Sequence, residues 1–232
     1  MMDLEMSSNI NKLLGKGLYS PAEAARYARV PTGTVNRWLF GNASGDAVLR
    51  SELGDSIRCV TFLDLLQIMA VRAIRAERSL PLQRIRDSVR RAEDDYNVSF
   101  PLARRHTTYL VNGNLTIRVG SDLIQVSGRD AHSLHLSERI IEHFMQDVGF
   151  DADGLGRSFR AFEYQRSEVI IEPAYRLGTP AVGKLRVPAE TLVHAYRTEG
   201  SMEAAAEAYG VTANDVDAAY RYFDHLNALN AA

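Results

Sequence analysis

The chain has 232 residues, enough for a sizeable core and about two domains. Hydrophobic residues make up 46% and charged residues 24%, a composition that excludes wholesale disorder. No apolar run reaches the roughly 18 residues that a membrane helix needs, and the first residues lack the order of a signal peptide. The single cysteine, Cys59, leaves no partner for an internal disulfide, so we expect a cytoplasmic protein.

The net charge of −2 conceals an uneven distribution along the chain. Residues 1–130 carry 18 Lys and Arg against 14 Asp and Glu, whereas residues 131–232 carry 9 against 15. A positive N-terminal part would help to attract a polyanion such as DNA, and an acidic C-terminal part would more readily contact a protein. Random variation in surface charge is the alternative explanation for so small an excess.

Residues 19–40 predict two short helices joined by a tight turn. Ser20 can cap the first helix, and Pro21 suits its first position because the missing N–H would be unpaired there anyway. The second helix follows the turn, with Thr32 as its expected cap. Small side chains would let the two helices cross closely, and these are Ala22, Ala25 and Ala28.

The second of these helices has one apolar and one polar face. Val35, Trp38 and Leu39 fall at i, i+3 and i+4, so they would form a buried stripe. The polar face carries side chains that can donate to phosphates and to base edges in a major groove. They are Thr34, Asn36 and Arg37. The pattern predicts a DNA-binding helix-turn-helix, with an ordinary pair of packed helices as the alternative.

Two short β-type runs, at 48–50 and 57–60, predict a small hairpin after the helix pair. A hairpin in this place is the wing of a winged helix, although one that only closes the domain fits equally well. On the first interpretation Arg50 and Arg58 become candidates for phosphate contacts. We expect Thr34, Asn36 and Arg37 to read bases. We expect phosphates to be held by Ser20, Arg26, Thr32, Arg50 and an arm with Lys12 and Lys16.

Two amphipathic helices are predicted next, over residues 61–78 and from Pro81 to about residue 95. Thr61 can cap the first helix. Its apolar stripe consists of Leu63, Leu66, Met69, Ala70, Val71 and Ile74. The stripe of the second helix consists of Leu82, Ile85, Val89 and Ala92. We expect the arginines at 84, 86, 90 and 91 to pair mostly with nearby acidic groups on a solvated face, with a second DNA surface as the alternative.

From about residue 106 the pattern changes to period two. Strands are predicted at 109–111, 115–119 and 123–127, separated by Asn- and Gly-rich turns, so a small antiparallel sheet should form. A helix capped by Ser137 should follow over 137–147. Further strands are expected at 159–164 and 169–171.

The last 45 residues return to a helical pattern, with three helices expected from Val187 onward. Ser201 should cap the second helix, Gly210 should end it, and Thr212 should cap the third. The buried stripe of the third helix would consist of Val216, Ala219, Tyr220 and Phe223. Acidic and polar residues should face solvent and repel phosphate, which favours a partner-binding role: Glu203, Glu207, Asn214, Asp215 and Asp217.

These elements predict an α+β protein that is mainly α-helical. Residues 1–105 would form a winged helix-turn-helix domain, residues 106–170 a small antiparallel β region that connects or dimerises, and residues 171–232 a C-terminal three-helix module. The sequence has no Gly-x-Ser-x-Gly motif, and Cys59 has no obvious histidine partner for catalysis. His132 and His135 lack the cysteine partners and helical spacing of a metal site. We therefore expect neither an enzyme nor a bound cofactor or metal.

Two family resemblances emerge from these motifs. Pro-Ala-Glu-Ala-Ala-Arg at 21–26 and Val-Pro-Thr-Gly-Thr-Val-Asn-Arg-Trp at 30–38 resemble the winged helix-turn-helix of the MerR superfamily, which usually has glycine where this chain has Arg29. Residues 171–192 and 204–223 resemble a short helical family, often found as antitoxins beside PIN-like ribonuclease toxins. The order of the two modules resembles a VapB-like antitoxin subfamily.

The resemblance implies a type II antitoxin that binds its toxin and also its own double-stranded operator DNA. PIN-like toxins cut RNA with clustered carboxylates and a divalent metal, among which an antitoxin arginine could insert. Candidates are Arg176, Arg186, Arg197 and Arg221, with surface salt bridges as their alternative role. A homodimer is expected because paired half-sites multiply specificity. The rival interpretations are a MerR-like ligand-responsive regulator with a sensor over 106–187, and an adaptor that contacts only proteins.

Overall fold

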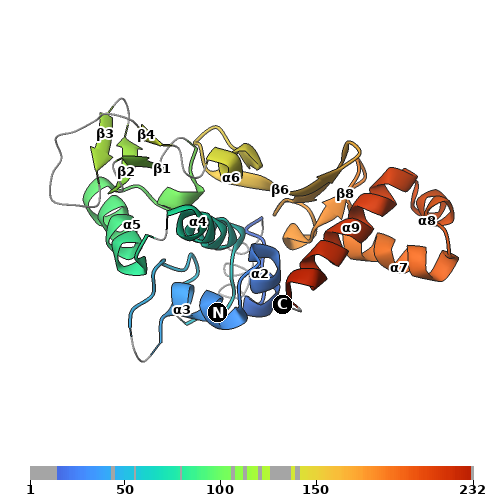
Figure 1. The fold of residues 1–232 in the computed structure, drawn as a ribbon, viewed down its shortest axis with the longest axis horizontal. Helices are drawn as coiled ribbons and strands as arrows, with labels where there is room; N and C mark the ends of the chain where they lie inside the picture. The colour runs from blue at the N-terminus through green and yellow to red at the C-terminus, as the bar shows by residue number, and fades with distance from the viewer. Residues whose placement is uncertain are drawn as a thin grey trace, which may run out of the picture. The chain divides into compact units, whose positions relative to one another are not determined.

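The computed structural model describes residues 15–42, 45–54, 56–78, 80–105, 108–111, 114–119, 122–125, 137–138 and 142–230. They form two compact units (Figure 1). The N-terminal unit spans Tyr19–Gly156, and the C-terminal unit spans Arg157–Ala232 together with the segment that ends at Leu18. This division differs from the three segments 1–105, 106–170 and 171–232 expected from the sequence.

The helices of the N-terminal unit are α2 (Pro21–Ala28), α3 (Thr32–Phe40), α4 (Phe62–Arg78), α5 (Leu82–Tyr96) and the short η1 (Pro101–Ala103). Helix α4 contacts α2, α3 and η1 (Figure 1). Every residue from 64 to 71 is buried, so this part of α4 lies in the core and is not one-sided as predicted, whereas Arg75 and Ala76 further along are exposed. Leu63, placed in the predicted stripe, is partly exposed.

The predicted packing of α3 is confirmed, because Val35, Trp38 and Leu39 are all buried. The contact face of α2 is shifted from the prediction: Ala24 is buried, whereas Ala22 is exposed. Ala24, Ala25 and Ala28 fall at i, i+1 and i+4 on one face of the helix, and Ala22 points away from that face. On α5 the buried apolar residues are Ile85, Val89 and Ala92, while Leu82 at the helix start is half-buried.

The predicted wing is wrong for the residues described, 45–54 and 56–60, where the two runs do not pair with each other. Val48 and Leu49 are buried, and their backbone N–H groups donate to the Trp38 carbonyl at 2.8 and 2.9 Å. Val60 instead forms an isolated antiparallel bridge with Tyr19. Long-range partners therefore satisfy the backbone groups that a hairpin would have used.

A four-stranded antiparallel sheet confirms the predicted period-two region, with strand order β3-β2-β1-β4. Its strands are β1 (Thr108–Val111), β2 (Asn114–Val119), β3 (Asp122–Gln125) and β4 (Ser137–Glu138). Ser137 was expected to cap a helix but pairs with Val111, because the edge of β1 offers unpaired backbone groups. Helix α6 (Glu142–Gln146) begins later, and β5 (Val148–Phe150) follows it.

In the described part of the chain, the C-terminal unit combines a sheet with three α-helices and one short 3-10 helix. Strands β6 (Gly156–Tyr164), β7 (Ser167–Ile171), β8 (Ala181–Val182) and β9 (Val187–Pro188) belong to a sheet of order β5-β6-β7-β8-β9. The helices are η2 (Arg176–Gly178), α7 (Ala189–Glu199), α8 (Met202–Tyr209) and α9 (Ala213–Asn230). Helix α9 packs on β7 and β8, and α7 and α8 pack on α9 (Figure 1).

The predicted helix ends of this unit are confirmed. Ser201 Oγ accepts from the Ala204 N–H at 3.1 Å, and Gly210 ends α8 in the left-handed conformation with φ 64°. Thr212 Oγ1 accepts from the Asp215 N–H at 3.2 Å. Asp215 is therefore buried by its capping role, where solvent exposure was expected. Tyr220, expected in the core stripe, is 37% exposed, and Tyr222 is buried on α9.

Gly156 provides a test of packing in the N-terminal unit. An alanine Cβ there would overlap Leu66 Cδ1 and lie 3.3 Å from the Ala103 carbonyl oxygen. We expect Gly156→Ala to lower the free energy of unfolding by about 1–3 kcal/mol, because a filled core accommodates an added methyl poorly. Urea unfolding followed by circular dichroism measures it. Gly33→Ala is the control, since its Cβ would meet nothing within 4 Å. Equal stability of both variants would contradict this packing.

Candidate functional site

The α2–α3 pair begins with a reciprocal capping arrangement. Ser20 Oγ accepts from the Glu23 N–H at 3.2 Å, and the Ser20 N–H donates to Glu23 Oε2 at 2.8 Å. The predicted cap is therefore confirmed. The Ser20 hydroxyl also donates to Glu23 Oε2 at 2.7 Å, so a phosphate at Ser20 would compete with this carboxylate.

The turn between the helices depends on Arg29, which has φ 56° and ψ 49°. Glycine favours this left-handed conformation, and the MerR-like pattern usually has glycine at this position. The Arg29 N–H donates to the Arg26 carbonyl at 3.3 Å, and the Val30 N–H donates to the Ala25 carbonyl at 3.0 Å. The arginine thus adopts the turn geometry that glycine would supply.

The outer face of α3 presents the residues expected to read bases. Arg37 is exposed, and its guanidinium has no partner among the residues that the structure describes. Thr34 and Asn36 are half-buried, and Asn36 Nδ2 donates to the Thr32 carbonyl at 3.1 Å. Thr32 is exposed but does not cap the helix, because Pro31 occupies the N-cap position with no side-chain bond.

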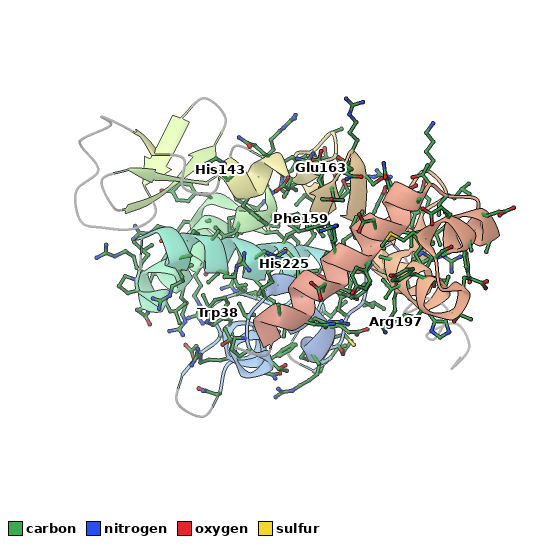
Figure 2. The ribbon with its side chains drawn as sticks, turned by 45° about the vertical axis from the view of Figure 1, so that its right-hand side comes forward. Trp38, His143, Phe159, Glu163, Arg197 and His225 are labelled. Carbon is green, nitrogen blue, oxygen red and sulfur yellow. The ribbon has the colours of Figure 1, made fainter. Side chains whose placement is uncertain are left out.

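Trp38 fixes α3 from its inner side (Figure 2). The side chain is 5% exposed, and the backbone carbonyl accepts the two N–H groups of Val48 and Leu49. A single residue therefore joins the helix to the core and to the segment that follows it. This anchoring keeps the polar face of α3 turned outward.

Arg50, expected to hold a phosphate, is instead bound to α5. Its Nη1 and Nη2 atoms lie 2.6 and 2.9 Å from the two carboxylate oxygens of Asp94, and Glu93 Oε2 is 3.3 Å away. The hydrogen bond to Arg50 lowers the pKa of Asp94 below its ordinary value. Of the other expected phosphate contacts, Arg26 and Lys16 are half-buried, while Lys12 lies outside the described residues.

Three arginines line a hollow of about 800 Å³ at the C-terminal end of α3, which the sequence analysis did not identify. They are Arg50, Arg58 and Arg90. The Arg58 guanidinium lies 5.3 Å from the centroid of the Phe40 ring. Arg90 Nη2 is 3.4 Å from Asp46 Oδ2. Arg50 and Arg58 come from the segment between α3 and α4 and were both candidates for phosphate contacts, whereas Arg90 comes from α5, and its distance along the chain concealed its place beside them.

The other α5 arginines show that part of the predicted self-pairing is confirmed. Arg86 donates to the carbonyl oxygens of Asp46 and Ala47, at 2.5 and 2.9 Å. Arg91 Nε lies 3.7 Å from Asp95 Oδ2, one turn along the helix. Helix α5 therefore uses Arg86, together with Arg90, to hold the loop that follows α3.

A buried carboxyl lies at the start of α4. Asp64 accepts backbone N–H groups from Thr61 at 3.2 Å and from Glu52 at 3.1 Å. Thr61 Oγ1 accepts from the Asp64 N–H at 3.2 Å, which confirms the predicted cap. Burial raises the pKa of Asp64 to about 7, although the backbone donors act against this rise.

The four arginines considered for toxin contact come from four different elements. Arg186 Nη2 lies 3.2 Å from Glu172 Oε2, and Arg221 Nε lies 2.9 Å from Asp217 Oδ1. Arg176 and Arg197 are exposed, and neither guanidinium has a partner in the described part of the chain (Figure 2 labels Arg197). Arg176 and Arg197 can thus meet an external carboxylate without first breaking an ion pair.

The C-terminal unit also contains a cleft of about 800 Å³, called here the C-terminal cleft. Of its lining residues, Arg186 was expected from the sequence as a candidate cation, Gly210 and Thr212 as helix ends, and Asp215 as a solvent-facing residue. The cleft adds two cations, Arg166 and Lys184, and two exposed apolar side chains, Tyr175 and Leu185. No periodic pattern in the sequence indicates that these residues line one cleft.

Potential metal ligands are dispersed over the described ranges. Within them, no three His, Cys, Asp or Glu side chains gather closely enough to hold a metal ion. His132 and His135, at which the sequence predicted no metal site, lie outside these ranges. No described helix has both the length and the apolar character needed to cross a bilayer.

No protein-family model matches the chain. A Mycobacterium tuberculosis protein named "Putative antitoxin VapB45" is 25% identical to it over 227 residues, which span 84% of this chain and 89% of that protein. The crystal structure of Rv2018 from Mycobacterium tuberculosis superposes with a TM-score of 0.61 at 21% identity, covering 89% of this chain and 99% of that one. The chain therefore shares its fold with a solved protein over most of its length.

Asp64 predicts a stability that depends on pH. In the folded chain its pKa is about 7, against an ordinary value of 3.8, so between these values only the folded state holds the proton. This contribution to stability is complete below about pH 4 and is lost as pH rises to about 7, at roughly 1.4 kcal/mol per pKa unit. We expect the free energy of unfolding of Asp64→Asn to decrease less between about pH 4 and 7 than that of the wild type. Urea unfolding at a series of pH values measures it. Parallel curves for the two proteins would rule out this role.

Proposed function

We propose that the chain is the antitoxin of a type II toxin–antitoxin pair and a binding protein, not an enzyme. The N-terminal unit would bind the operator of its own gene and repress it, and the C-terminal unit would bind a PIN-like ribonuclease toxin. The similarity to the protein named VapB45 supports the antitoxin part of the proposal. We place this function in the cytoplasm.

The outer face of α3 is the observation that carries the DNA-binding part. Arg37 extends from a helix that the buried Trp38 anchors, and its guanidinium is unpaired among the described residues. A guanidinium in this position can donate two hydrogen bonds to a guanine edge in the major groove. Thr34 and Asn36 flank it, and Thr32 would contact the backbone phosphates.

Dimerisation would complete the operator complex. Helix α3 has nine residues, and one short recognition helix contacts few base pairs. Two copies of the chain on half-sites about one helical turn apart would multiply the specificity of each. We therefore propose a homodimer on a palindromic operator.

Neutralisation of the toxin would use a cation of the C-terminal unit. Ribonucleases of the PIN type hold a divalent metal between carboxylates, and a guanidinium can occupy the same place by bidentate hydrogen bonds. Arg176 and Arg197 are the preferred candidates, because each is exposed and unpaired within the described residues. Arg186 and Arg221 would first have to leave Glu172 and Asp217.

Replacement of Arg37 tests the DNA interface. We expect Arg37→Ala to weaken binding to a duplex from the region upstream of its own gene by roughly 5- to 150-fold, which corresponds to about 1–3 kcal/mol for a lost base contact. Electrophoretic mobility shift at fixed salt measures the affinity. Arg91→Ala is the matched control, since it removes the same charge from α5. Unchanged affinity for Arg37→Ala would refute the assignment of α3.

Co-expression with the product of the adjacent gene tests the toxin interface. We expect a stoichiometric complex in which ribonuclease activity is silenced, because the C-terminal unit would cover the toxin carboxylates. Size-exclusion chromatography and an RNA cleavage assay measure the two effects. Failure to form the complex, together with release of DNA by a small molecule, would instead identify a ligand-responsive regulator.

A further inference from the structure

The C-terminal cleft is formed by parts of the chain that lie far apart in sequence. Arg166 comes from the turn between β6 and β7, and Lys184 comes from the loop between β8 and β9. Gly210 and Thr212, from the turn between α8 and α9, line the same cleft. The cleft therefore belongs to one unit and is complete within it.

The acidic residues that line the cleft are already occupied. Glu168 Oε1 lies 3.1 Å from Arg160 Nη1. Asp215 Oδ2 accepts the backbone N–H of Thr212 at 3.0 Å and its hydroxyl at 2.8 Å. Glu168 is therefore paired with a cation outside the cleft lining, and Asp215 Oδ2 is engaged in capping the start of α9.

The cations of the cleft are in excess over its free anions. Arg186 is paired with Glu172 at 3.2 Å. Arg166 and Lys184 are both exposed, and neither has a side-chain partner among the residues described. An external anion would therefore find two unpaired positive charges at this cleft.

The backbone holds two of these arginines in an unfavourable conformation. Gln165 and Arg166 form the two-residue turn between Tyr164 and Ser167, with φ values of 48° and 68°. Such a hairpin turn normally contains Asn-Gly, because long L side chains disfavour positive φ. Arg186 also has a positive φ, of 51°. Strained residues of this kind gather at binding sites, which supports a ligand at the cleft.

Apolar side chains adjoin these charges. Leu185 is 67% exposed and Tyr175 is 49% exposed, whereas large apolar side chains are usually buried. Both line the cleft beside Lys184 and Arg186. The combination of cations with exposed apolar groups favours a ligand that has carboxylates and an apolar side chain together.

We propose that the C-terminal cleft binds an acidic segment of a partner protein. Carboxylates of the segment pair with Arg166 and Lys184, and an apolar residue beside them packs on Leu185 and Tyr175. A long nucleic acid fits the unit less well, since residues 157–232 carry ten Asp and Glu against eight Lys and Arg. The exposed acidic residues on α7 and α8 would repel its phosphates: Glu190, Glu199, Glu203 and Glu207.

Fluorescence anisotropy with the full chain tests this inference. The probe is a short labelled peptide rich in glutamate with one central phenylalanine, and the reference is the same peptide with glutamine in place of glutamate. We expect the glutamate peptide to bind at least about ten-fold more tightly, since two charge pairs form only with it. The inference concerns the chemistry of the segment and does not depend on the identity of the toxin.

Charge reversal locates the binding. We expect the double variant Arg166→Glu/Lys184→Glu to lower the affinity for the glutamate peptide by about ten-fold or more. Arg91→Glu/Arg157→Glu makes the same change of charge at exposed positions that do not line the cleft, and it should leave the affinity within about two-fold of the wild-type value. Arg166→Gln/Lys184→Gln removes the charge without reversing it and should also weaken binding. Circular dichroism verifies that each variant is folded.

Three results would overturn the inference. They are equal binding of the two peptides, wild-type affinity in the Arg166→Glu/Lys184→Glu variant, and preferential binding of a single-stranded oligonucleotide that this variant abolishes. Binding of the glutamate peptide by a chain that does not silence the ribonuclease would refute the proposed function and leave the inference standing. If the chain silences the ribonuclease but does not bind the peptide, the inference is refuted and the proposed function stands.

Discussion

The N-terminal unit depends on the burial of α4, which is complete over residues 64–71. A helix as short as α3, with nine residues, is not stable in water without tertiary contacts. Both α2 and α3 contact α4, where each fully buried Leu, Ile or Phe contributes roughly 1.5–3 kcal/mol. Polar groups of the same helix form hydrogen bonds that fix the position of neighbouring segments. Asp64 accepts the Glu52 backbone N–H, and Arg72 Nη1 donates to the Ala28 carbonyl at 3.1 Å.

Local sequence patterns located the longer helices and strands, although the helix expected over 137–147 begins only at Glu142. The stripe of Val35, Trp38 and Leu39 and the caps at Ser20 and Ser201 depend on residues a few positions apart, so periodicity and capping rules located them. The run at 48–50 has strand-forming residues, yet its backbone bonds to Trp38 and not to the second run. The hairpin prediction therefore failed because a distant partner decided the outcome.

The candidate sites show the same limit. The exposure of Arg37 followed from its place opposite the buried stripe of α3. The partner of Arg50 did not, because Asp94 lies 44 residues further along the chain. Arg166 and Lys184 were missed, since a hairpin turn and a loop meet in one cleft only after folding. A charged side chain can be located from the sequence more readily than its counterion can.

The ion pairs of the N-terminal unit also determine how it would respond to salt. Monovalent ions are released on association only from charges that mobile ions had compensated before. The guanidiniums of Arg50 and Arg90 already lie within 3.5 Å of carboxylate oxygens, so the protein itself supplies their counterions. An anion that binds Arg50 must displace Asp94, and one that binds Arg90 must displace Asp46, so the guanidinium only replaces one acceptor by another. The ionic-strength sensitivity of polyanion binding would thus reflect a few uncommitted side chains such as Arg37, and not the total arginine content.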